Sequence, residues 1–159
     1  MRLKIGSAGI AVERGDITDW EVDALVNATN TNLTMAAGVP ATIKKKGGVV
    51  IEEEAVSQGP AEVGEAYLST GGNLRATHVI HAVIMEPDRK PQADTVALTT
   101  RAIMALADKH RITSIAMPAL GTGVGQVPPA ESAQSMMDVV FNHLKTGTSP
   151  VKRVVFVLY

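Results

Sequence analysis

The sequence predicts an α/β fold with a mainly parallel sheet, because apolar runs rich in β-branched residues alternate along the chain with amphipathic segments of helical period. The later runs are apolar on both faces, as in strands that helices cover on two sides. The predicted strands are 10–12, 24–26, 78–83, 114–117 and 151–158, and the predicted helices are 39–46, 47–58, 94–109 and 129–144.

The ends of the predicted helices carry suitable residues. Asp94 is placed to cap the helix at 94–109, and Pro128 and Pro129 stand where the last helix would begin. Gly47 and Gly48 follow the helix at 39–46 as a C-cap. The lysines at 44–46 therefore lie in its last turn, where the helix dipole favours cations. We interpret them as a solvated helix end and not as a phosphate-binding patch.

The composition of the 159-residue chain excludes several classes of function. With 15 basic and 16 acidic side chains, the net charge of -1 provides no general attraction for nucleic acid or an anionic membrane. One Trp, two Tyr and two Phe are too few for a base-stacking platform. The absence of cysteine excludes thiol catalysis and disulfide scaffolds and favours a cytoplasmic location. No two histidines have metal-ligand spacing on one helix, so we expect neither a metal nor a cofactor.

The N-terminus lacks a secretory apolar core, and no apolar run approaches the roughly 20 residues that span a bilayer, so no membrane association is expected. Three polar or glycine-rich segments instead follow predicted strands, where open α/β sheets bind ligands. They are 14–18 (RGDIT), 26–30 (VNATN) with the neighbouring 35–40 (MAAGVP), and 118–126 (PALGTGVGQ).

The alternating glycines of 118–126 allow successive backbone N–H groups to converge on an anion. A tight turn that needs positive φ explains these glycines equally well. A Walker A motif is excluded because no Gly-Lys-Ser/Thr follows, and Gln126 breaks the Rossmann spacing.

The segment 35–40 predicts a second anion site. Ala37 and Gly38 precede a helix whose N-terminus exposes unpaired N–H groups and a partial positive charge. Asn27 and Asn30 end the preceding strand, where their amides can donate to and accept from ribose hydroxyls. Local turn formation is the structural alternative for both asparagines.

Together these segments resemble the macro domain family. The resemblance implies a three-layer α/β/α sandwich around a six- or seven-stranded, largely parallel mixed sheet. It also implies that residues 1–159 form a single macro domain without the terminal helix that usually follows the family's last strand. Five motifs agree in order over nearly the whole chain, with the third and fourth resembling the family's middle strands: 15–18 (GDIT), 23–30 (DALVNATN), 59–66 (GPAEVGEA), 77–83 (THVIHAV) and 118–124 (PALGTGV).

The resemblance further implies a cleft for ADP-ribose above the strand ends. Asp16 would accept a hydrogen bond from the adenine amino group, the backbone of Ile17 would read the ring, and Tyr159 would lie against it. Asn30 would contact the distal ribose, and two glycine-containing backbone stretches would bracket the diphosphate. With Asn27, the candidate ligand-binding residues are Asp16, Ile17, Asn27, Asn30, Ala37, Gly38, Val39, Gly121, Thr122, Gly123, Val124, Gly125 and Tyr159.

The chain departs from the family at two places. The family's His-Gly-Gly-Gly-Val-Ala is replaced by 35–40 (MAAGVP), so that Met35 stands where a polar residue would lie beside the distal ribose. Gly125 stands where an aromatic residue commonly covers that ribose, so we expect a more open cleft there.

Two functions remain open. Family enzymes hydrolyse bonds at the distal ribose with a positioned water, and Asn30 would position the ribose or the water in a mono-ADP-ribosyl or O-acetyl-ADP-ribose hydrolase. The alternative is a non-catalytic reader recruited to ADP-ribosylated partners. We expect the partner to be ADP-ribose or an ADP-ribosylated macromolecule, and among nucleic acids only poly(ADP-ribose) or poly(A). His78 and His81 lie in an apolar run, so we interpret them as packed structural side chains and not as general bases.

Overall fold

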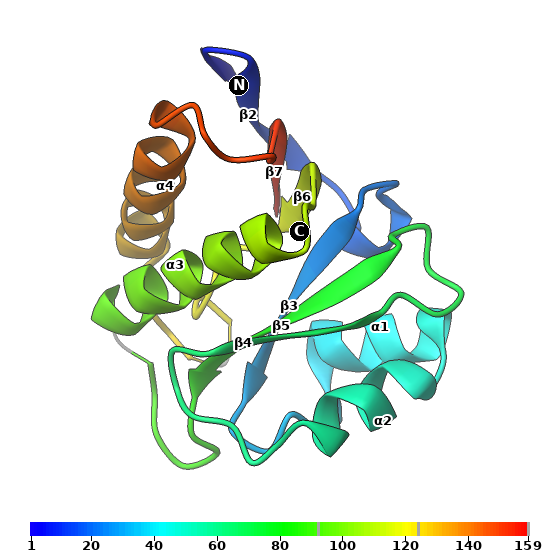
Figure 1. Cartoon of the computed structure of the whole chain (residues 1–159). Helices are drawn as coiled ribbons and strands as arrows, with labels where there is room; N and C mark the ends of the chain where they lie inside the picture. Colours follow the sequence, from blue (N-terminus) through cyan, green and yellow to red (C-terminus); the bar gives the residue numbers. More distant parts are fainter. Residues whose placement is uncertain (92, 124, 159) are drawn as a thin grey trace.

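The computed structural model describes residues 1–91, 93–123 and 125–158, in which one mixed sheet lies between two helical layers (Figure 1). Its seven strands are β1 (Arg2–Ile5), β2 (Ala8–Arg14), β3 (Ala24–Asn30), β4 (Ala66–Thr70), β5 (His78–Met85), β6 (Ser114–Met117) and β7 (Arg153–Leu158). They are ordered β1-β2-β7-β6-β3-β5-β4. β1 is antiparallel to β2 and β4 is antiparallel to β5, while the other neighbours are parallel.

Among the described residues, two helices cover each face of the sheet (Figure 1). α1 (Gly38–Gly47) and α2 (Val50–Ser57) pack on one face, and α3 (Ala93–Lys109) and α4 (Pro129–Lys145) pack on the other. A short 3-10 turn, η1 (Ile17–Asp19), follows β2. This is the three-layer sandwich that the resemblance implies. Of the six or seven strands implied, the sheet has seven.

Alternation along the strands divides the apolar side chains between two cores. Val26 of β3 belongs to the larger cluster, against α3 and α4, whereas its neighbour Leu25 belongs to the second, against α1 and α2. Because the central strands are covered on both faces, apolar residues occupy both faces along most of their length, as predicted. Fully buried members of the larger core include Ile80, Ile103, Met104, Met136 and Val140.

The predicted elements are present, with one additional strand and some shifted ends. β1 has no predicted counterpart because its residues are mostly exposed and lack an apolar run. The strand implied at 59–66 begins only at Ala66, because Gly64 adopts φ +96° and turns the chain. Asp94 lies within the first turn of α3 and does not cap it, although its charge there still complements the helix dipole.

The other helix ends agree with the sequence. Pro128 is the N-cap of α4 and Pro129 is its first residue. Gly48 ends α1 with φ +107°, and its N–H donates to the Lys44 carbonyl at 2.8 Å. In the part of the chain that the structure describes, no helix is both long and apolar enough to cross a membrane.

Candidate functional site

The parallel strands bring the three candidate segments to one edge of the sheet. β2, β7, β6, β3 and β5 share one direction, so their carboxyl ends meet at this edge. The Gly15 N–H donates to the Leu158 carbonyl at 2.8 Å and joins the end of β2 to that of β7. Asn30 ends β3, and the glycine-rich loop follows β6. The predicted edge is therefore the place where all three segments lie.

Asp16 forms the first part of the site, at the end of β2. Its Oδ1 accepts hydrogen bonds from the Thr18 N–H at 2.9 Å and the Thr18 hydroxyl at 2.6 Å, so that Asp16 caps η1. Its Oδ2 lies 2.8 Å from the Lys46 ammonium. The hydrogen bond from Lys46, followed by that from Thr18, lowers the pKa of Asp16 to about 2. An ionised carboxylate of this kind is an acceptor only, as recognition of an amino group requires.

The lysines at the end of α1 lie in its last turn, as the sequence predicts, and Lys45 and Lys46 are exposed. Lys44 pairs with Glu52 of α2 at 3.3 Å, and Lys46 pairs with Asp16. Of these three lysines, only Lys45 makes no ion pair with the described residues. The helix end is therefore solvated as predicted, but positions 44 and 46 also face carboxylates on neighbouring elements, which the sequence does not predict.

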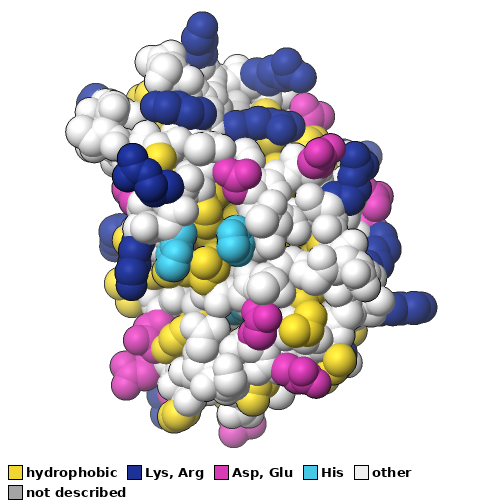
Figure 2. Space-filling model, turned by 45° about the vertical axis from the view of Figure 1, so that its right-hand side comes forward, with side chains coloured by type: hydrophobic (Ala, Val, Ile, Leu, Met, Phe, Trp, Pro, Cys, Tyr) yellow, Lys and Arg dark blue, Asp and Glu magenta, His cyan; other side chains and the backbone are white. Residues whose placement is uncertain are grey.

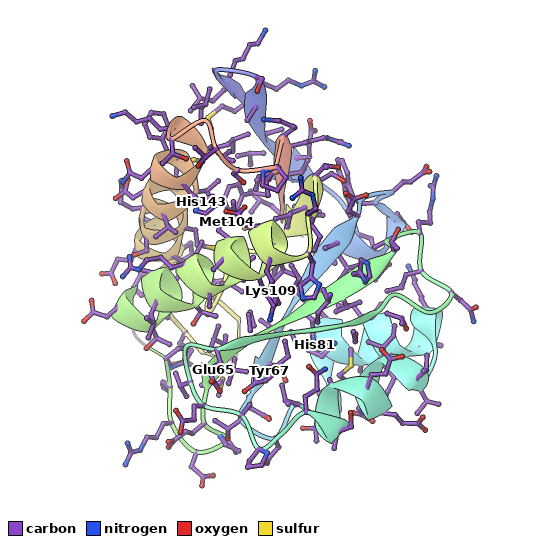
Figure 3. All side chains as sticks on the ribbon, in the orientation of Figure 1. Glu65, Tyr67, His81, Met104, Lys109 and His143 are labelled. Atoms are coloured by element: carbon purple, nitrogen blue, oxygen red, sulfur yellow. The ribbon has the colours of Figure 1, made fainter. Side chains whose placement is uncertain are left out.

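Asn27 lies inside the molecule, below the edge. Its side chain is fully buried, and its Nδ2 lies 3.2 Å from Nδ1 of His81. His81 lies on β5 (Figure 3), and its Nε2 is 2.8 Å from the Ser69 hydroxyl on β4. Burial lowers the pKa of His81 to about 4, so the ring is neutral near pH 7. His81 thus has the packed, hydrogen-bonded environment that the sequence suggests, and Asn27 has no surface to offer a ligand.

Asn30 lies three residues further along β3 and is partly exposed. Its Oδ1 accepts a hydrogen bond from the Asn32 N–H at 2.9 Å, which is the Asx turn considered as the alternative. Its Nδ2 has no partner within the described residues. Asn30 therefore combines a structural carbonyl with an amide group that can donate to a ligand hydroxyl.

The N-terminus of α1 is open to solvent. Ala37 is its N-cap, with φ -150° and no side-chain hydrogen bond, and Gly38 follows with φ +65°. Ala36, Ala37 and Gly38 are exposed, as is Val39, so the first N–H groups of the helix face outward. The small residues of this segment thus leave the helix end open, as the predicted anion site would require.

Met35 is not beside this open end. It is fully buried in the core against α1 and α2, and its N–H donates to Glu52 Oε2 at 2.6 Å. The expectation that Met35 removes a polar group from the ligand's side is therefore wrong, because position 35 points into the core of this chain.

The glycine-rich loop uses its glycines in different ways. Gly121 has φ +77°, and its carbonyl accepts the Val127 N–H at 2.8 Å. Gly125 is buried, and a Cβ there would lie 2.5 Å from Pro91 Cγ and 2.7 Å from the Gly121 carbonyl oxygen. Gly123 has nothing within 4 Å of a Cβ. Gly125 thus permits the loop to pack, whereas Gly123 faces open space.

This packing also corrects an expectation. The cleft is not opened by Gly125, because Pro91 occupies the space beside it. Thr122 lies between Gly121 and Gly123, and its hydroxyl donates to the Ala119 carbonyl at 2.9 Å. Val124 and Tyr159, both candidate ligand contacts, lie outside the described residues.

Two surface hollows lie near the Asp16 end of the site. The hollow that contains Asp16 has a volume of about 560 Å³, with Trp20 and Arg153 in its wall. A larger hollow of about 710 Å³ shares these two residues but lies over β1, β2 and β7, away from the strand ends. The larger volume reflects an uncovered sheet face, and we assign the site by its chemistry at the edge.

The surface charges support a local site. On one face, Lys and Arg side chains lie mainly over the upper half, with Asp and Glu between them and below (Figure 2). No extended basic face is visible there, in agreement with the net charge of -1. Over residues 1–91, 93–123 and 125–158, no group of three His, Asp or Glu side chains is arranged to hold a metal ion.

Comparison with known proteins decides the family. The macro domain family matches residues 26–136. A protein of Aquifex aeolicus is 42% identical over 132 residues, which are 82% of this chain and 80% of that protein. The chain belongs to the macro domain family. A macro domain-containing protein of Caldanaerobacter subterraneus is 36% identical over 94% of this chain and 88% of its own length.

Solved macrodomains share the whole architecture. The Trypanosoma brucei macrodomain in complex with ADP-ribose superposes with a TM-score of 0.86 at 28% identity over 94% of this chain. The match spans 63% of that longer chain. An Oceanobacillus iheyensis macrodomain variant matches with a TM-score of 0.89 at 25% identity, over 100% of this macro domain and 88% of the other chain.

Proposed function

We propose that this macro domain binds ADP-ribose at the carboxyl edge of its sheet. The observation that carries the proposal is the placement of three different recognition elements on one edge. The ionised Asp16 can accept from an adenine amino group, the open N-terminus of α1 can bind phosphate, and Gly123 leaves space for close backbone approach. The Trypanosoma brucei neighbour, which was crystallised with ADP-ribose, supports the same ligand class.

The roles of the site residues follow from their positions. Asp16 and the Ile17 backbone would hold adenine, Gly38 and Val39 would meet the diphosphate from one side, and Gly123 would meet it from the other. The Asn30 amide would donate to the distal ribose. Tyr159 stays a candidate for adenine stacking. Asn27 is omitted because it is buried and bonded to His81.

Calorimetric titration with ADP-ribose tests this function. We expect heat with a single binding site for the wild-type protein, and about tenfold weaker affinity for Asp16→Ala, because hydrogen bonds to charged groups contribute about 1.5 to 3 kcal/mol. Lys45→Ala is the matched control, since Lys45 is exposed and makes no ion pair in the described structure. No heat at millimolar ligand, with folding verified by circular dichroism, would overturn the proposal.

We further propose that the bound ligand is an ADP-ribose derivative cleaved by water at the distal ribose, with Asn30 orienting the ribose. Its Nδ2 is unpartnered within the described residues and lies on the candidate edge. Incubation with mono-ADP-ribosylated protein and with O-acetyl-ADP-ribose tests this activity. Product that Asn30→Ala abolishes supports hydrolysis, whereas binding without product in either assay identifies a reader.

The alternative is a non-catalytic reader. The Asn30 carbonyl oxygen uses one of its two acceptor positions in the Asx turn with Asn32, so this side chain has fewer groups to hold a water than a free carboxamide would. In either case the macromolecular partner would carry ADP-ribose. The absence of cysteine supports a cytoplasmic site of action.

A further inference from the structure

Lys46 joins helix α1 to the loop that begins at Asp16. Its Nζ lies 2.8 Å from Asp16 Oδ2 and 2.7 Å from Thr18 Oγ1, with Asp19 Oδ1 at 3.6 Å. The Thr18 hydroxyl in turn donates to Asp16 Oδ1 at 2.6 Å. An ammonium group has three hydrogens, and this one has three oxygen neighbours on a single loop. The two oxygens of Asp16 are therefore tied together through Lys46 and Thr18.

These contacts leave one defined position for a ligand on Asp16. Oδ1 already accepts both the N–H and the hydroxyl of Thr18. A carboxylate oxygen has two acceptor positions, so Oδ2 keeps one after it has accepted from Lys46. The Asp16 side chain is 36% exposed, so this remaining position is accessible to solvent.

We propose that Lys46 is a positioning residue for the adenine end of the cleft. It holds the Asp16 carboxylate with Oδ2 available to an adenine amino group, and it ties the loop of residues 16–19 to helix α1. This inference rests on the proposed function. Because α1 begins at Gly38 and Lys46 lies eight residues later, the helix spaces the adenine end from the phosphate end by about 12 Å.

The electrostatics of the loop agree with this role. The hydrogen bond from Lys46 is the largest cause of the low pKa of Asp16, and the Asp16 carboxylate in turn raises the pKa of Lys46. Without Lys46, the carboxylates of Asp16 and Asp19 would repel each other without a cation between them, and Asp16 would take up a proton at a higher pH. A protonated Asp16 is a poorer acceptor for an amino group.

Lys45 provides a matched control on the same helix. It has the same charge and a neighbouring position, but it is exposed and pairs with no carboxylate in the described part of the chain. Lys45→Met and Lys46→Met therefore change the net charge equally, and only the second removes the contacts with Asp16 and Thr18.

The experiment measures dissociation constants of two ligands for wild type, Lys46→Met, Lys46→Arg and Lys45→Met at pH 7.5. The ligands are ADP-ribose and its hypoxanthine counterpart, which lacks the amino group. For Lys46→Met we expect about fivefold to tenfold weaker binding of ADP-ribose and a reduced preference for it over the hypoxanthine ligand. Lys45→Met should stay within about twofold of wild type, and Lys46→Arg should recover most of the loss.

A pH series adds a readout that a purely structural role would not change. Protonation of the ligand changes the dissociation constants of Lys46→Met and wild type by the same factor, so this effect cancels in the ratio of the two constants. We expect this ratio to rise as the pH falls from about 5 to 3, because loss of Lys46 returns the pKa of Asp16 toward its ordinary value of 3.8, whereas the wild-type Asp16, with a pKa of about 2, stays mostly ionised. Melting temperatures verify that each variant is folded.

The outcomes separate the two proposals. If wild type binds and Lys46→Met binds equally well, or loses affinity for both ligands alike with a pH-independent ratio, then the positioning role is overturned and the proposed function stands. If the folded wild-type protein binds neither ligand, then the proposed function fails, and the role of Lys46 in it fails as well.

Discussion

Two glycines of the loop after β6 should respond in opposite ways to the same substitution. A Cβ at Gly125 would lie 2.5 and 2.8 Å from the Pro91 ring and 2.7 Å from the Gly121 carbonyl oxygen, whereas a Cβ at Gly123 would meet nothing within 4 Å. Gly125→Ala must therefore displace a rigid ring or the backbone. Gly123→Ala adds a methyl group only to the open space that we assign to the diphosphate.

The structure sets the size of both effects. Overpacking of this kind costs about 1 to 3 kcal/mol. In a domain of this length, each kcal/mol lowers the melting temperature by about 2 to 4 °C, so Gly125→Ala should melt roughly 4 to 8 °C below wild type for a cost of about 2 kcal/mol. Gly123→Ala should be unchanged or slightly more stable, because alanine restricts the unfolded chain by about 0.4 to 1 kcal/mol.

Thermal unfolding and ADP-ribose titration of the two variants form the assay. We expect Gly125→Ala to lose stability, and Gly123→Ala to keep its stability but bind ADP-ribose about tenfold more weakly, since the methyl group blocks backbone approach. If Gly123→Ala lost stability and Gly125→Ala did not, the division of roles within the loop would be refuted. Wild-type affinity in Gly123→Ala would remove this loop from the ligand site.

Two further substitutions test buried positions. The pKa of His81 falls from 6.5 to about 4 on folding, so its contribution to the free energy of unfolding should be fully present above pH 6.5 and fall by roughly 3 kcal/mol as the pH falls to 4. Urea unfolding at a series of pH values should show this decrease. The variant His81→Gln should show a smaller one. An unchanged slope would show that His81 is not the titrating group. Met35→His restores the family's polar residue at a fully buried position, so it should cost about 2 to 4 kcal/mol without improving ADP-ribose binding. Tighter binding by a stable Met35→His protein would place position 35 in the cleft after all.

The layering of this domain could be predicted because local patterns determine it. The run at 114–117 agrees with β6 at both ends, and Pro129 begins α4 where the sequence places it. β1 could not be predicted in this way. It is an edge strand whose residues are mostly exposed, and its formation depends on pairing with β2 and not on an apolar pattern of its own.

The site was predictable to the level of segments but not of individual contacts. The three loops lie on one edge because parallel strands require it, and this rule needs no side-chain detail. The contacts of Lys46 and the burial of Met35 depend on which neighbouring element each residue faces across space. Residue type and spacing do not predict which neighbouring element a side chain faces. For Lys46, the only indication in the sequence is an acidic residue such as Asp16 on the loop after β2.

Asn27 and Gly125 show the same limit in different forms. The sequence places Asn27 near the end of a strand, but it cannot tell that His81 on the neighbouring strand takes up its amide. The glycine at 125 correctly predicts that no side chain projects from this position. The space is nevertheless filled by Pro91, which lies far away in the sequence. Both positions are determined by tertiary packing.

A crystal structure of the protein soaked with ADP-ribose tests the central claim most directly. We predict adenine with its amino group within hydrogen-bond distance of Asp16 Oδ2, and the diphosphate between the N–H groups at the start of α1 and the backbone of Gly123. Ligand density over β1, β2 and β7, beside Trp20 and Arg153, would contradict the claim. So would a fully folded protein without bound ligand at saturating ADP-ribose.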